Sequence, residues 1–262
     1  MRALRLDVEY DGGAFAGWAV QPGRRTIEGA LRGALDLVVR SPYELRVAGR
    51  TDAGVHATGQ VAGLATEAPI APMSLARALG GLLPRDVAVR RVTEMPPGFD
   101  ARRDARSRTY EYRLLRGAAS PLRRGRVLHV RGALDTDAMA AATAGVVGVH
   151  DFQAFTPTRT VHRHFNRTIM ECAWHAREDE LVLRVRADAF LRHMVRVLVG
   201  TLLLVGRGTW TAERFVGLLE GAPRSASGPT APAHPLTLVD VEYDPSGSAP
   251  AGTGLVVPIR AG

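Results

Sequence analysis

The chain has 262 residues, of which 46% are hydrophobic, and it carries 34 Lys plus Arg against 26 Asp plus Glu, a formal charge of +8. This length and apolar content suffice for one large domain or two modest domains with packed cores. The positive charge favours a polyanionic partner, and nucleic acid is the leading candidate.

Residue usage excludes several classes of protein. Every basic residue is arginine and none is lysine, so neither a Schiff-base lysine nor a Walker A phosphate loop is possible. The single cysteine, Cys172, excludes an internal disulfide and a zinc ribbon. No apolar run reaches about 18 residues and the first residues read as a strand, so we expect a cytoplasmic protein without a membrane span.

The first hundred residues predict the order β-α-β-β-α-β. Apolar residues alternate with charged ones over residues 4–10, which is typical of a half-buried strand. Thr26 is placed to cap the helix that follows. Strands are then expected at residues 43–49 and 60–66, on either side of a glycine-bracketed loop. A helix over 72–82 and a strand over 87–92 complete the unit.

The same order returns in the second half of the chain. The expected elements are a strand at 107–116, a helix at 136–146 capped by Asp135, a hairpin of strands 168–175 and 180–187, a helix at 191–205 and a strand at 236–243. The repetition predicts an α+β fold of two ferredoxin-like halves with mainly antiparallel sheets, helices on one face and an RNA-binding cleft on the other.

This organisation divides the chain into residues 1–105, residues 106–245 and a flexible tail at 246–262. Two segments depart from the strand and helix pattern. Residues 117–126 are basic and contain Gly and Pro, and residues 149–166 are expected to form a polar insertion that faces RNA or a dimer partner. His162 and His164 lack a third ligand at suitable spacing, so we expect no metal site there.

Asp52 is the candidate catalytic residue of the first half. It lies on the loop between two expected strands, where Gly49 and Gly54 permit unusual backbone angles and close approach of a ligand. Arg50 and His56 bring cationic or hydrogen-bonding groups near it in sequence. These residues alone predict only a turn with an exposed carboxylate, because Asp and Gly are common turn formers.

The longer motif around Asp52 resembles the signature of the tRNA pseudouridine synthase A family. The matching string is GRTDAGVHATGQV at residues 49–61. Four more segments resemble the family in the right order: VEYDGGAFAGW from Val8, FDARRDARSRTYEYRL from Phe99, AFLRHMVRVLVGTLLLVGRG from Ala189 and APAHPLTLVDVEY from Ala231. The sequence departs from the family in having Val197 after Arg196, where Asn is usual, and Pro235 where Gly is common.

The resemblance implies an isomerase that converts uridine to pseudouridine at positions 38, 39 and 40 of the tRNA anticodon stem-loop. It implies that Asp52 is the nucleophile, that Tyr110 contacts the target base and that Arg196 is the charged partner of the aspartate. Arg50 and Leu238 are further candidates for substrate binding. The resemblance also implies a homodimer that binds tRNA and needs no metal and no small-molecule cofactor.

Taken alone, each of these residues keeps an ordinary structural explanation. Arg196 is also explained as a solvated helix arginine, and Tyr110 as a residue that packs a sheet. Because the target base must leave its stack, an aromatic face and a basic surface are the features expected of the reaction. The candidate backbone-binding arginines are Arg24, Arg25, Arg102, Arg103, Arg106, Arg108, Arg123, Arg124 and Arg126.

Two alternatives belong to other functional classes. A catalytically inactive tRNA-binding protein or RNA chaperone would need the basic clusters but not the set of Asp52, Tyr110 and Arg196. A carboxylate-dependent nuclease would need further acidic groups to hold metal ions, and no such cluster lies near Asp52 in the sequence.

Overall fold

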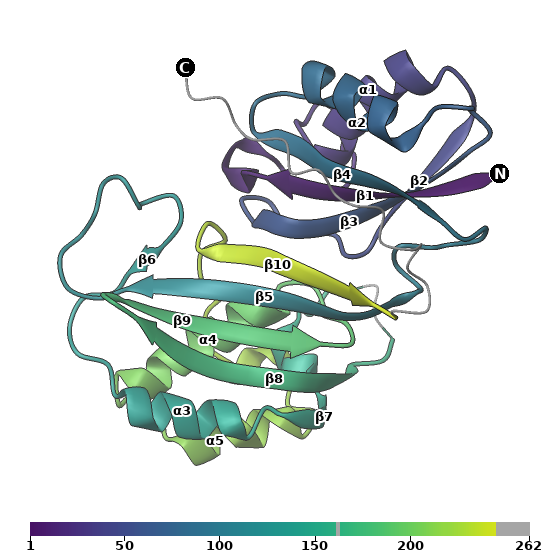
Figure 1. Ribbon diagram of the computed structural model, residues 1–262. Coiled ribbons are helices and arrows are strands. Elements are labelled where there is room, and N and C mark those ends of the chain that lie inside the picture. Colours follow the sequence, from purple (N-terminus) through teal and green to yellow (C-terminus); the bar gives the residue numbers. More distant parts are fainter. Residues whose placement is uncertain (161–162, 245–262) are drawn as a thin grey trace.

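The protein, described here by a computed structural model over residues 1–160 and 163–244, is a mixed α+β fold built on one ten-stranded sheet (Figure 1). The tail that the sequence predicts to be flexible, 246–262, lies outside the described residues, as does His162. The strand order is β4-β1-β3-β10-β5-β9-β8-β7, with β2 paired to β3 and β6 paired to β5.

The first half follows the predicted order. Its elements are β1 (Arg2–Tyr10), α1 (Ile27–Val39), β2 (Tyr43–Val47), β3 (His56–Thr66), α2 (Pro72–Leu82) and β4 (Val87–Met95). The alternation in β1 places Leu4 and Leu6, both fully buried, on the face that packs against the helices. The Thr26 side chain accepts a hydrogen bond from the Gly29 amide, which confirms the predicted helix cap.

The second half repeats this order with additional short elements. It consists of β5 (Ala105–Leu115), β6 (Leu128–His129), α3 (Thr136–Ala144), β7 (Gly148–Asp151), β8 (Asn166–Arg177), β9 (Glu180–Ala187), α4 (Met194–Gly206), α5 (Ala212–Val216) and β10 (Leu236–Tyr243). Asp135 caps α3 as predicted, by accepting from the Ala138 amide. In Figure 1, α1 and α2 lie against the first four strands, and α3, α4 and α5 lie at the opposite end of the molecule.

A short parallel contact merges the two halves into one sheet. β10 pairs with β3 only at Thr237 with His56 and at Leu238 with Ala57, immediately after the Asp52 loop. At Gly59 a Cβ would lie 2.2 Å from the Val239 carbonyl oxygen, so this seam requires a residue without a side chain. The sequence predicted two sheets, because a two-residue parallel pairing leaves no periodic signal of its own.

The structure differs from the sequence predictions in two places that affect function. Residues 149–166 are not simply a polar insertion, because Phe152 and Phe155 in this segment are fully buried and join the core. The helix expected from residue 191 begins at Met194, because His193 takes a left-handed conformation with φ 61°. Over the residues with described coordinates, no helix is long and apolar enough to cross a bilayer.

Helix α4 is held close to the chain that precedes β10. A Cβ at Gly200 would lie 1.8 Å from the carbonyl oxygen of Pro229. Nothing lies within 4 Å of the corresponding position at Gly33 in α1, which is exposed. Position 200 therefore has no room for a larger residue than glycine, whereas position 33 does.

We predict that Gly200→Ala lowers the free energy of unfolding by about 2 kcal/mol or more, because α4 or the 229–231 segment must move. Gly33→Ala should raise it by about 0.5–1 kcal/mol through the better helix propensity of alanine. Urea unfolding of the two variants measures this difference. Equal stability of the two variants would contradict the close packing of α4.

Candidate active site

The loop that carries Asp52 is hydrogen-bonded to the turn after β1. The Trp18 amide donates to the Thr51 carbonyl at 3.0 Å, and the Gly54 amide donates to the Phe15 carbonyl at 3.3 Å. At Gly17 a Cβ would lie 2.9 Å from the Thr51 carbonyl oxygen, so the turn and the loop are in direct backbone contact. The backbone on both sides of Asp52 is therefore fixed by hydrogen bonds.

Buried side chains also form hydrogen bonds with the Asp52 loop and with each other. The Tyr10 hydroxyl lies 2.7 Å from Thr51 Oγ1, and the Gln60 amide nitrogen donates both to Tyr10 Oη and to the Gly49 carbonyl. Gln60 is fully buried and Tyr10 is 2% exposed. Burial is the main cause that raises the pKa of Tyr10 to about 12, so this phenol stays neutral near neutral pH.

The Asp52 carboxylate meets two groups from the start of α4. Arg196 Nη1 lies 3.3 Å from Asp52 Oδ2, and His193 Nε2 lies 3.6 Å from the same oxygen. The side chains are partly shielded, with exposed fractions of 25% for Asp52 and 17% for Arg196. The predicted charged partner of Asp52 is therefore placed beside it, and His193 is an additional neighbour that the sequence did not predict.

Arg196 is held in place by the backbone that leads into β10. Its Nε donates to the Ala231 carbonyl at 2.8 Å, while the Ala231 amide donates to the Arg196 carbonyl at 3.0 Å. The Tyr112 hydroxyl donates to the next carbonyl, that of Pro232, at 3.0 Å. The guanidinium is thus oriented by fixed protein groups as well as by the carboxylate.

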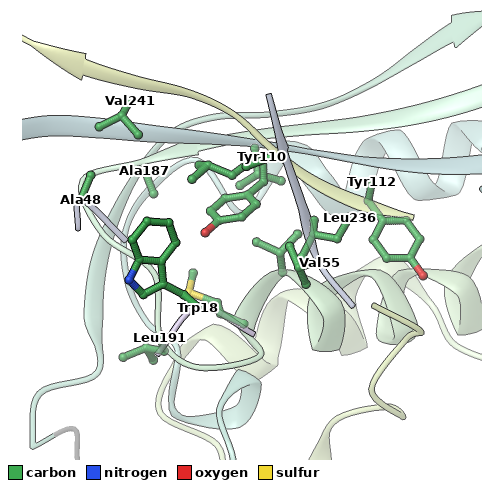
Figure 2. Packing of buried hydrophobic residues seen from close by; sticks show 14 of the residues in the cluster. Trp18, Ala48, Val55, Tyr110, Tyr112, Ala187, Leu191, Leu236 and Val241 are labelled. Carbon is green, nitrogen blue, oxygen red and sulfur yellow. The ribbon is translucent and has the colours of Figure 1, made fainter. Parts of the chain in front are cut away.

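Tyr110 and Leu238 are both buried in the hydrophobic core. Figure 2 shows Tyr110 among the buried residues of this cluster, with Trp18 and Val55 nearby. Tyr110 and Leu238 are register partners on β5 and β10, and Tyr110 packs edge to face on Phe190 with 5.0 Å between ring centroids. Burial, together with the nearby Tyr10 and Asp52, raises the pKa of the Tyr110 phenol far above its usual value. Among the described residues its hydroxyl has no hydrogen-bond partner, whereas Tyr112 uses its hydroxyl on Pro232.

The two cationic neighbours expected from the local sequence do not contact Asp52. Arg50 is exposed, and no ion pair joins it to a described residue. His56 is buried, accepts from the Gly12 amide at Nδ1 and lies 3.0 Å through Nε2 from the Gly125 carbonyl. Burial lowers the His56 pKa, so the ring is neutral and its 3.0 Å approach to Asp11 is not a charged pair.

The sequence is similar to known proteins of one family. A family model described as tRNA pseudouridine synthase matches residues 142–244. A tRNA pseudouridine synthase A from Chloroflexus aurantiacus is 45% identical over 94% of this chain and 90% of its own length. Proteins of the same name from Frankia casuarinae and Shouchella clausii are 46% and 40% identical, over 92% and 93% of this chain and 89% and 94% of their own lengths.

This chain belongs to the tRNA pseudouridine synthase A family. Its members named above match almost the whole sequence, so the relation covers both halves and the seam between them.

A buried arginine on β5, Arg108, ties the end of β2 to the second half of the chain. Arg108 is 8% exposed and donates to four backbone carbonyls, at 2.8 Å to Ala48, 2.7 Å to Arg102, 3.1 Å to Ala105 and 2.7 Å to Asp188. Burial lowers its pKa. The prediction that Arg108 binds the RNA backbone is therefore wrong, because its guanidinium is fully engaged inside the protein.

Other predicted arginines line an open groove beside the Asp52 loop. The groove has a volume of about 710 Å³, and it does not include Asp52. Arg25 pairs with Asp86 there at 2.7 Å, and Arg126 pairs with Asp11 at 2.9 Å. The groove brings together members of two arginine clusters that are a hundred residues apart in sequence.

The described ranges contain no group of three or more His, Cys, Asp or Glu side chains arranged to hold a metal ion. The ion-pair partners of Asp52 in these ranges are His193 and Arg196, so the carboxylate lies beside one guanidinium and one imidazole. Such a set fits charge stabilisation by protein groups.

We predict that Arg108→Met lowers the free energy of unfolding by about 2–4 kcal/mol, because four buried carbonyls lose a charged donor. Arg106→Met is the matched control, since the Arg106 side chain is 66% exposed and, among the described residues, pairs with Asp244 alone. Its effect should stay below about 0.5 kcal/mol. Chemical denaturation measures both changes, and similar stability of the two variants would contradict the internal role of Arg108.

Proposed function

We propose that this protein isomerises uridine to pseudouridine in tRNA and that Asp52 is its nucleophile. The observation that carries the proposal is the contact of Asp52 with Arg196, which unites two separate motifs of the family at 3.3 Å. The family membership supplies the class of reaction and substrate. The geometry supplies a carboxylate that is presented on a fixed loop.

The chemistry requires that the bond from ribose C1′ to uracil N1 breaks, that the base turns while it stays trapped, and that C1′ joins C5. The C5 proton leaves, and N1 regains a proton. A carboxylate assists by attacking the substrate or by stabilising charge while the glycosidic bond breaks. Arg196 supplies the opposite charge beside Oδ2, where a bound base would exclude water.

We assign substrate-binding roles to the residues around Asp52. Tyr110 offers an aromatic ring and a hydroxyl close to the carboxylate, and Leu238 packs beside it on the neighbouring strand. Arg50 is exposed two residues before Asp52, where its guanidinium can reach the RNA. The extruded uridine would then lie between the Asp52 loop and Tyr110.

Recognition of the tRNA is proposed to depend on shape and phosphate contacts, as expected of an enzyme that acts at positions 38, 39 and 40. Arg25 and Arg126 in the groove are backbone-binding candidates.

We further propose a cytoplasmic homodimer. Each subunit would consist of two ferredoxin-like halves, 1–105 and 106–245, with an RNA-binding cleft on the open sheet faces.

A catalytically inactive tRNA-binding protein is the remaining alternative. Such a protein would need the arginine groove but would have no use for a supported carboxylate with a preoriented arginine. Ala231 accepts a hydrogen bond from the Arg196 side chain and donates one to the Arg196 backbone carbonyl. This fixed orientation of Arg196 favours the enzyme, because binding of RNA alone would not require it.

We expect the purified wild-type protein to form pseudouridine in unmodified tRNA bearing uridine at positions 38, 39 or 40. Asp52→Ala should lower the rate by about 1,000-fold or more, since loss of a nucleophile removes the central catalytic group. The exposed Asp137→Asn in α3 is the control and should keep the wild-type rate within twofold. Site-resolved mapping of pseudouridine measures the product, and a mutant as fast as wild type would refute the nucleophile assignment.

The homodimer has a separate test. Light scattering at working concentration should give about twice the chain mass of 28.1 kDa. A mass equal to a single chain, in a sample that forms pseudouridine, would contradict the dimer and leave the chemistry in place.

A further inference from the structure

His193 has an unusual backbone conformation at the start of α4. Its φ is 61° and its ψ is 1°, in the left-handed region that residues other than glycine rarely adopt. Two other described non-glycine residues, Arg40 and Glu178, have positive φ. They lie at a helix C-terminus and in a hairpin turn, where this conformation is common.

The conformation of His193 is unusual for its position as well. The residues that precede α1, α2, α3 and α5 are all extended, and three of them accept a hydrogen bond from the first helical turn. His193 precedes α4 without making such a bond. The strained backbone of His193 is therefore not explained by capping of α4. Residues with strained backbones are often found at functional sites.

The imidazole of His193 lies beside the Asp52 carboxylate. His193 Nε2 lies 3.6 Å from Asp52 Oδ2, and in the described part of the chain the ring has no other ion-pair or hydrogen-bond partner. Arg196 contacts the same oxygen. Within the described ranges Asp52 Oδ1 has neither kind of partner, so the two carboxylate oxygens have different surroundings.

We propose that His193 is a positioning residue for the isomerisation, one that donates its Nε2 proton to Asp52 Oδ2 as a neutral imidazole and, with Arg196, leaves Oδ1 free to react. The inference rests on the proposed function. We expect the 3.6 Å separation to be shorter in the complex with substrate, because catalytic hydrogen bonds are often long in structures without one.

The charges around His193 keep the ring neutral. Burial lowers its pKa most strongly, Asp52 raises it, and Arg196, Arg192 and Arg224 lower it. The imidazole is therefore uncharged at neutral pH and gains a proton only below its ordinary range. Protonation places a second full positive charge beside Asp52 and weakens its carboxylate as a nucleophile, so the rate falls as the pH falls.

Two variants separate this role from a structural one. His193→Gly removes the imidazole but suits the left-handed backbone, so the protein should unfold at the wild-type temperature or above it. Its kcat for pseudouridine formation should fall about 10- to 100-fold, the loss expected when a hydrogen bond to a charged group is removed. KM for tRNA should change less than threefold, because Asp52, Tyr110 and the arginine groove remain.

His193→Gln restores a neutral donor and should recover most of kcat. Because glutamine does not titrate, this variant should lose the decline in kcat that wild type shows as the pH falls below the ordinary histidine pKa of about 6.5. His129→Gln, in the short strand β6, is the histidine control and should retain that decline.

A His193→Gly enzyme with wild-type kcat and the same pH profile would overturn the inference. Equal loss in the Gly and Gln variants, with the acid decline retained in both, would also overturn it. These results would leave the proposed function intact, since wild type would still form product. Absence of product from wild type on tRNA would overturn both.

Discussion

The contact between Asp52 and Arg196 joins residues 144 positions apart and depends on most of the fold. The aspartate is carried by a loop of the first half, and the arginine by a helix of the second. The two parallel pairs between β10 and β3 fix the distance between these elements. Close packing at Gly59 and Gly200 draws β10 and its leading segment against β3 and α4.

The groups that orient the ion pair are mostly backbone atoms. Ala231 holds Arg196 through its carbonyl and its amide, and the turn ending at Trp18 holds the Asp52 loop. Arg108 adds a buried cation whose hydrogen bonds to the described residues all go to backbone carbonyl oxygens, and it ties the end of β2 to the second half. Fixed partners of this kind reduce the reorganisation needed when charge develops during a reaction.

Local patterns in the sequence predicted those parts of the fold that depend on neighbouring residues. The strand alternation from Leu4, the cap at Thr26 and the cap at Asp135 each follow from side-chain spacing, and the structure confirms them. The β10–β3 seam was missed because pairing between distant strands is a tertiary property. The buried Phe152 and Phe155 were missed because polar neighbours hide them in the sequence.

The sequence likewise predicted some residues of the candidate site and missed others. The motif resemblance predicted the pairing of Asp52 with Arg196, although neither periodicity nor charge in the sequence could have done so. Arg108 was misread as a surface residue, since an arginine that binds buried carbonyls has the same local sequence as one that binds phosphate. His193 gave no signal, because its contact with Asp52 joins distant parts of the chain and its left-handed backbone is not typical of a histidine before a helix.

The most direct test of this account is a double-mutant cycle on pseudouridine formation with Asp52→Asn, Arg196→Met and the double variant, measured under single-turnover conditions with excess enzyme. If Arg196 acts through the carboxylate, the double variant reacts as slowly as Asp52→Asn and no slower. Losses that multiply across the two substitutions would show that the residues act independently, which would contradict the central role of their contact.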